Sequence, residues 1–143
     1  MWKRILLVFV ALILLSACAA QPSKPATDIT VEMTDFAYNP SSITVPVGEP
    51  VTLTLKNVGN IEHDLVVEKI DATPKVVEDR GSDAHHAHGE QQNYDLHVSA
   101  NAGETSVIEL TVAEPGTYRV FCSVEGHEEA GMIGELVVLP SQE

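Results

Sequence analysis

The stretch SVIELTVAEPGTYRVFC, residues 106–122, decides the fold class of this 143-residue chain. In residues 106–112 apolar side chains alternate with more polar ones, which is the pattern of a β-strand with one face in the core and one in water. Residues 114–116, Glu-Pro-Gly, are a turn signal, and the alternation resumes over 117–122. Because Arg119 belongs in water, Cys122 points toward the core at the end of its strand.

The same alternation extends in both directions from this stretch. It recurs, with turn residues between the segments, at 28–33, 42–47, 51–57, 63–70 and 133–139. Seven or eight short strands without a convincing helix predict an all-β domain, an antiparallel β-sandwich or barrel, over residues 28–140. Residues 71–92 lose the alternation and predict a long polar loop.

The N-terminal residues resemble an export signal. A basic start at Lys3 and Arg4 is followed by an unbroken apolar run over 5–15. Eleven apolar residues are too few for a helix to cross a hydrocarbon core of about 30 Å, although a membrane-anchoring helix is the alternative interpretation. We therefore expect residues 1–17 to be a signal peptide that is removed.

The end of this signal, Leu15-Ser16-Ala17-Cys18, resembles a bacterial lipobox. It predicts that Cys18 carries lipid and that 18–27, rich in Pro, Ala and Ser, is a tether. We expect a membrane-anchored lipoprotein outside the cytoplasm, on the periplasmic side or outer face of the membrane. With Cys18 acylated, Cys122 has no disulfide partner in the chain, so it is either buried and inert or bound to something.

The charge of the chain limits its partners. From Cys18 onward 6 basic and 21 acidic residues give a formal charge of 6 − 21 = −15. Nucleic acid and anionic membrane surfaces are therefore not expected ligands. A basic protein partner fits better, and a generally solvated acidic surface is the alternative.

Residues after Cys122 suggest a metal site. Cys122, His127 and Met132 follow one another at even intervals, and thiolate with thioether suits Cu(I), whereas Zn(II) rarely accepts a thioether. A site of two histidines and one cysteine with a weak methionine is the blue-copper arrangement, so a second histidine must come from elsewhere. His63 is the candidate, because it opens a strand after the turn at 57–60. In the alternative interpretation none of these residues binds metal: His63 is an ordinary histidine at a strand end, Cys122 is an inert buried thiol, and Met132 is a core side chain.

The sequence as a whole resembles the cupredoxins of the plastocyanin and azurin family. The resemblance rests on the Pro-Gly-Thr-Tyr corner at 115–118, on AGMxG at 130–134, and on FAYNPSSITVPVGEPVTLTLKNVGNIEHDLVV at 36–67. The Cys-x4-His-x4-Met spacing is similar to that of auracyanins. The family resemblance implies a Greek-key β-sandwich that holds one type 1 copper ion. It also implies that His63, Cys122 and His127 form the trigonal plane and that Met132 is the axial contact.

Two features depart from the family. Asp64 stands where members often carry Asn, and Ser123 can still donate to it. An ionised carboxylate there is expected to stabilise Cu(II) and lower the reduction potential. In addition Glu125, Glu128 and Glu129 crowd the ligand loop, where they either dock a basic partner or merely solubilise the protein.

The predicted long loop holds a second concentration of ligands, His85, His86 and His88. Short histidine-rich tracts can bind metal ions, so a second metal site is a hypothesis for this loop, and a flexible solvated loop is the favoured interpretation. His97, beyond the loop in an expected strand, is interpreted as a surface or rim histidine.

The predicted function is single-electron transfer rather than catalysis, because the protein fills all four copper positions and catalytic metals need an open one. Two other copper classes are not expected. The sequence lacks the two cysteines in one loop that a binuclear copper centre needs, and it has a single His-x-His pair, His86 and His88 in the expected loop, instead of the several pairs and further domains of a multicopper oxidase. Copper delivery to an oxidase or for copper resistance is the alternative, and a thiol enzyme using Cys122 with His127 is a third. The expected partner is a basic redox protein such as a c-type cytochrome or an oxidase, and the expected state is a monomer.

Overall fold

The computed structural model describes residues 25–81 and 94–140. Within them the chain forms ten strands: β1 (Asp28–Thr34), β2 (Ala37–Asn39), β3 (Ser42–Pro46), β4 (Val51–Asn57), β5 (His63–Val67), β6 (Ala72–Glu78), β7 (Leu96–Ala100), β8 (Thr105–Val112), β9 (Gly116–Phe121) and β10 (Ile133–Leu139). No helix in these two ranges is long and apolar enough to span a bilayer.

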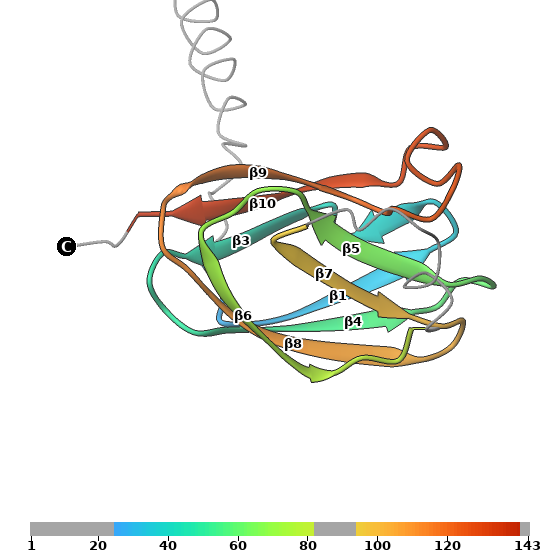
Figure 1. Cartoon of the computed structure of the whole chain (residues 1–143), viewed down its shortest axis with the longest axis horizontal. Coiled ribbons are helices and arrows are strands. Elements are labelled where there is room, and N and C mark those ends of the chain that lie inside the picture. The colour runs from blue at the N-terminus through green and yellow to red at the C-terminus, as the bar shows by residue number, and fades with distance from the viewer. Residues whose placement is uncertain (1–24, 82–93, 141–143) are drawn as a thin grey trace, which may run out of the picture.

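In this described part the strands form two sheets that pack face to face (Figure 1). One has the order β2-β1-β4-β8-β6 and the other β3-β10-β9-β5-β7. The all-β sandwich predicted from the sequence is confirmed, but its sheets are mixed, because β1 pairs with β4 and β3 with β10 in parallel. Alternation could not reveal this, since a half-buried strand shows it whichever way its neighbour runs.

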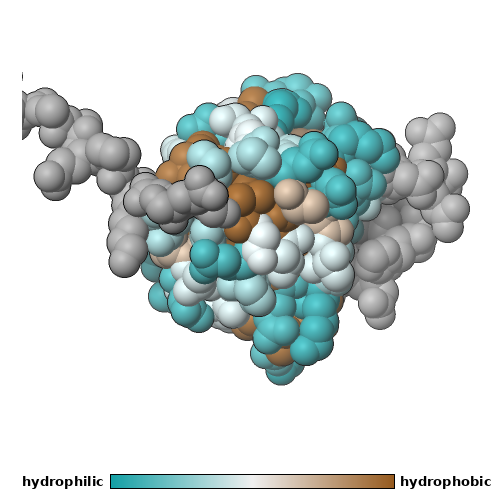
Figure 2. Space-filling model, turned by 90° about the vertical axis from the view of Figure 1, so that its left-hand side faces the viewer, coloured by the Kyte–Doolittle hydropathy of each residue, from teal (hydrophilic) through white to brown (hydrophobic). Residues whose placement is uncertain are grey.

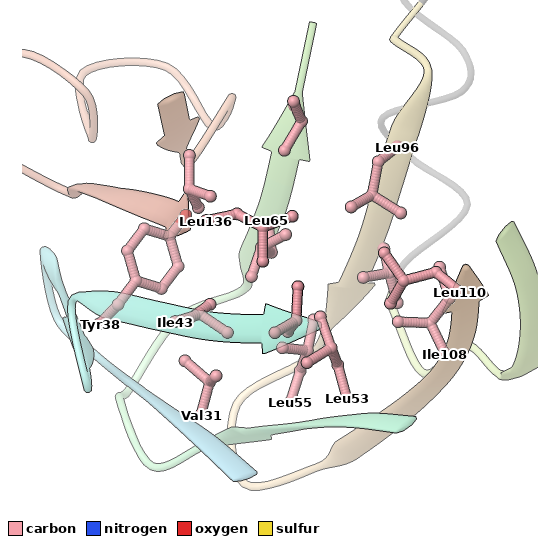
Figure 3. Packing of buried hydrophobic residues seen from close by; sticks show 14 of the residues in the cluster. Val31, Tyr38, Ile43, Leu53, Leu55, Leu65, Leu96, Ile108, Leu110 and Leu136 are labelled. Carbon is pink, nitrogen blue, oxygen red and sulfur yellow. The ribbon is translucent and has the colours of Figure 1, made fainter. Parts of the chain in front are cut away.

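The core lies between the two sheets, as the side chains of Figure 3 show. In β4 the residues Val51, Leu53 and Leu55 are buried, while Thr52 and Thr54 between them are half-buried. Burying one such aliphatic side chain stabilises the fold by roughly 1.5–3 kcal/mol. The alternation read from the sequence is therefore the alternation of core and outer face.

The expected loop over 71–92 is partly wrong. Its first part is strand β6, which lies at a sheet edge and pairs only with β8. Almost all of β6 is exposed, so no apolar alternation marks it in the sequence. Because β6 and the three-residue β2 were not predicted, the described residues contain ten strands rather than the predicted seven or eight. Residues 82–93 of the expected loop lie outside the described residues.

The two ends of the sandwich differ. The connection from β9 to β10 lies at the right-hand end in Figure 1, whereas β1 begins at the opposite end and runs toward it. Figure 2 faces that opposite end, where hydrophilic residues surround a central group of hydrophobic ones. A seven-residue strand such as β1 spans about 23 Å, so the chain enters the described domain far from the β9–β10 connection.

Candidate metal centre

Three elements position the predicted ligands at one end of the sandwich. His63 is the first residue of β5, and Cys122 directly follows the last residue of β9. The chain then turns through His127 and Met132 into β10. Backbone hydrogen bonds from Met132 N to His127 O (3.0 Å) and from Cys122 N to Met132 O (3.2 Å) close this turn.

The structure brings three of the four predicted ligands into one buried cluster. The ligand atoms of His63, Cys122 and His127 all lie within 4.8 Å of one another. Nδ1 of His127 is 3.2 Å from Nδ1 of His63 and 3.3 Å from Sγ of Cys122. His63, Cys122 and Met132 are fully buried, and His127 is 5% exposed. Met132 is tied to the cluster through its backbone bonds to His127 and Cys122.

Cys122 is a poor nucleophile in the metal-free protein. Burial, reinforced by the charge of Asp64, raises the pKa of its thiol to about 12, so the thiolate is scarce at neutral pH. The backbone N–H of Asp64 donates to Sγ over 3.5 Å. A fully buried, protonated thiol does not suit the third sequence interpretation, a thiol enzyme. A bound metal ion would deprotonate such a thiol outright.

Asp64 ties the ligand strands together. Its carboxylate accepts from the Ser123 N–H (2.6 Å) and from the Ser123 hydroxyl, as the sequence suggested, and lies 3.2 Å from His97 Nε2. Burial alone would raise the pKa of Asp64, but the hydrogen bonds from His97 and Ser123 outweigh burial and hold this pKa below its usual value. Asp64 is therefore an ionised group at neutral pH, and His97, interpreted as a rim histidine, supports it from β7.

Asp35 is a site residue that the sequence interpretation missed. Its Oδ1 lies 3.3 Å from Nε2 of His63, and its carboxylate accepts from the backbone N–H and side-chain amide of Asn60 at 2.9 and 2.8 Å. The side-chain and backbone hydrogen bonds from Asn60 lower the pKa of Asp35. No local pattern marks Asp35, because its contact with His63 joins positions 28 residues apart.

The chemistry of this cluster fits a soft metal ion. Two imidazole nitrogens and one sulfur converge in a buried space, and thiolate with imidazole is the donor set that copper prefers. Two Nδ1 lone pairs 3.2 Å apart would repel each other, whereas a cation between them would satisfy both.

Comparison with known proteins agrees with this donor set. Residues 25–139 match the model of the copper-binding proteins of the plastocyanin/azurin family. The chain is a cupredoxin. This cupredoxin is 34% identical over 103 residues to plastocyanin A/B of Petroselinum crispum, covering 72% of the chain and 88% of that protein. It is 30% identical over 117 residues to the copper-resistant cuproprotein CopI of Rubrivivax gelatinosus, covering 81% and 68%.

A solved structure supports the fold of the cupredoxin. The dithionite-reduced auracyanin of the photosynthetic bacterium Roseiflexus castenholzii superposes with a TM-score of 0.63 at 24% identity, covering 82% of this chain and all of that one. Copper is therefore the cofactor of this centre, and the cluster of His63, Cys122 and His127 is consistent with one type 1 ion. The other predicted site residues, Cys18, His85, His86 and His88, lie outside the described residues.

Proposed function

We propose that this cupredoxin carries single electrons between redox partners outside the cytoplasm by cycling between Cu(II) and Cu(I). His63, Cys122, His127 and Met132 would hold the ion. Copper would supply the one-electron couple, and the ligand atoms of His63, Cys122 and His127 lie within 4.8 Å of one another, which supports the proposal.

The observation that carries the proposal is the burial of the donor set. His63, Cys122 and Met132 have no exposed surface and His127 has little, so a substrate has no approach to an open metal position. Ligands held by two packed sheets also move little when the metal changes charge, which favours rapid electron exchange. The hydrogen bonds of Asp64 to Ser123 and Cys122 add to this rigidity.

The proposal is tested by spectroscopy of the copper-loaded full chain. We expect an intense visible absorption from a Cu(II)–thiolate bond, with the matching EPR signal, that a mild reductant bleaches and an oxidant restores. Cys122→Ser should abolish this absorption while the far-ultraviolet circular dichroism of the metal-free protein stays the same. A wild-type protein that binds copper without a thiolate band would refute the electron-carrier proposal.

Copper delivery for resistance is the second candidate, and the similarity to CopI favours it. The two functions differ in how quickly the metal leaves. A carrier with four buried ligands should keep Cu(I) for hours when mixed with a Cu(I)-specific chelator, whereas a delivery protein should release it within seconds. Stopped-flow measurement of the chelator complex separates these outcomes.

We further propose that a lipid on Cys18 anchors the protein to the membrane. The anchored protein is proposed to be a monomer. The entry of the chain opposite the ligand loop supports the anchor, because a tether there would leave the copper end free to meet a partner. Replacing Cys18 by Ser should move the protein from the membrane to the soluble fraction. Mass spectrometry of the wild-type protein that finds Cys18 unmodified would contradict the anchor.

A further inference from the structure

The turn between β1 and β2 touches both imidazoles of the metal centre. Asp35 lies 3.3 Å from Nε2 of His63, and the ring of Phe36 meets that of His127 edge to face, with centroids 5.2 Å apart. β1 and β2 belong to one sheet, whereas His63 begins β5 in the other. A residue of the turn between two strands of one sheet, Asp35, therefore contacts a predicted ligand, His63, that belongs to the other sheet.

The local structure holds Asp35 in this place. Its two carboxylate oxygens accept from the backbone and side chain of Asn60. A Cβ at Gly59 would lie 2.4 Å from Asp35 Oδ1 and 2.9 Å from His63 Nε2, so the contact exists only because position 59 has no side chain. Phe36 has a φ of 71°, a left-handed conformation that aromatic residues rarely adopt and that a functional turn can retain.

The chemistry of imidazole makes the contact directional. A neutral imidazole has one N–H and one nitrogen with a lone pair, and a carboxylate only accepts. A carboxylate at Nε2 therefore favours the tautomer of His63 that carries the proton on Nε2 and the lone pair on Nδ1. Nδ1 is the atom that faces His127, 3.2 Å away, within the ligand cluster.

We infer that Asp35 is a positioning residue of the metal centre. Its carboxylate accepts a hydrogen bond from the Nε2–H of His63, and this bond leaves the Nδ1 lone pair facing the copper position. The inference rests on the proposed metal binding by His63. Carboxylates that hold a histidine ligand in this way fix its ring and raise its basicity, and their loss lowers metal affinity by roughly 10–100-fold.

The first test uses the metal-free full chain. Nitrogen-15 chemical shifts of His63 should show a protonated Nε2 and a bare Nδ1 in the wild-type protein. Asp35→Ala should increase the share of the Nδ1-protonated form, whereas Asp35→Asn should retain the wild-type form because the amide oxygen still accepts. Wild-type shifts for His63 in Asp35→Ala would overturn the inference.

The second test measures Cu(I) affinity by competition with a chelator. We expect a loss of at least tenfold in Asp35→Ala and a smaller loss in Asp35→Asn. Asp71→Asn is the control for charge, because Asp71 is exposed and its carbonyl accepts from Ala113 at the far end of the sandwich. An affinity of Asp35→Ala equal to that of the control contradicts the positioning role.

These outcomes are distinguishable from failure of the proposed function. If the wild-type protein lacks the copper–thiolate band, the electron-carrier proposal fails, while the His63 shifts of the metal-free protein still decide the role of Asp35. If Asp35→Ala does not fold, Asn60→Ala replaces it, since it removes one of the donors that hold Asp35. A smaller change of the His63 shifts in the same direction supports the inference, and unchanged shifts overturn it.

Discussion

Asp64 is a buried carboxylate next to a metal ligand, and it is tolerated because donors surround it. The Ser123 backbone N–H, the Ser123 hydroxyl and the imidazole of His97 all bond to its side chain, and the hydroxyl of Tyr38 donates to its backbone carbonyl over 2.6 Å. A charge left without such partners would cost several kcal/mol to bury. The backbone N–H of Asp64 donates to Sγ of Cys122, so this charge belongs to a residue in direct contact with a predicted copper ligand.

Asp64→Asn is expected to raise the reduction potential of the copper centre. The substitution removes a negative charge beside Cys122, and that charge stabilises Cu(II) more than Cu(I). A redox titration followed by the visible band measures the change. The control is Asp71→Asn, which removes an equal charge at the far end of the molecule and should leave the potential almost unchanged. A lower potential in Asp64→Asn would contradict the prediction.

His97 is expected to make the stability of the metal-free protein depend on pH. Its hydrogen bond to Asp64 raises the pKa of His97 above the usual 6.5, aided by the charges of Asp64, Asp79 and Glu62. The protonated form therefore stabilises the fold, fully below pH 6.5 and no longer once the pH has risen through the folded-state pKa.

Urea unfolding of the wild-type protein and of His97→Gln at several pH values tests this linkage. Gln still donates to Asp64 but does not titrate, so the difference in unfolding free energy should be larger at about pH 5 than at about pH 9. Effects of the other histidines cancel in this difference. A gap that stays constant with pH would show that His97 acts only as a neutral hydrogen-bond donor.

At the scale of elements, β5 and β6 show why the strands differ in how readily they are predicted. β5 lies inside its sheet between β9 and β7, and all five of its residues are buried. β6 lies at an edge with both faces largely in water, so its polar residues give no strand pattern. Alternation predicted the strands that have one core face and missed β6, because alternation reports burial rather than hydrogen bonding.

Shortening a core side chain of β5 should cost far more than shortening one of β6. Leu65 is buried in the core, whereas Val77 is 53% exposed. We expect Leu65→Ala to lower the free energy of unfolding by about 2–5 kcal/mol and Val77→Ala by about 0.5 kcal/mol or less. Chemical denaturation of the metal-free protein measures both, and equal losses would contradict the assignment of β6 as an edge strand.

At the scale of the whole molecule, a group of acidic side chains lies beside the ligand loop. Glu125, Glu128 and Glu129 line a depression with Glu68, beside Phe121. Arg119 forms an ion pair with Glu128, and its guanidinium lies 5.0 Å from the ring of Phe121. With a formal charge of −13 for the full chain, these glutamates are compatible with the basic partner expected from the sequence, which we propose docks here.

Electron transfer to a cationic c-type cytochrome should slow as salt is added. Attraction between opposite charges raises association rates by roughly 10–10³-fold, and screening removes this gain. Stopped-flow oxidation of the Cu(I) protein at increasing ionic strength measures the rate. Ferricyanide is the control, because an anion is repelled and should react faster with salt. A rate with the cytochrome that does not respond to salt would contradict a docking role for the glutamates.

The sequence by itself determined the features that depend on local order. Period-two alternation predicted most of the strands, and the chemical softness of Cys122, His127 and Met132 with their even spacing indicated copper. These inferences hold because the core face of a strand and the donor atoms of a tight loop are set by residues close to one another in the chain.

Only the tertiary structure showed the contacts between distant segments that neither the local patterns nor the family resemblance had indicated. It joined β1 to β4 and β3 to β10 in parallel, placed Asp35 on His63, and set His97 against Asp64. Each of these contacts links positions from different strands or turns, and the packing of two sheets creates them. A pattern within one segment cannot encode a hydrogen bond whose partner is chosen by the fold.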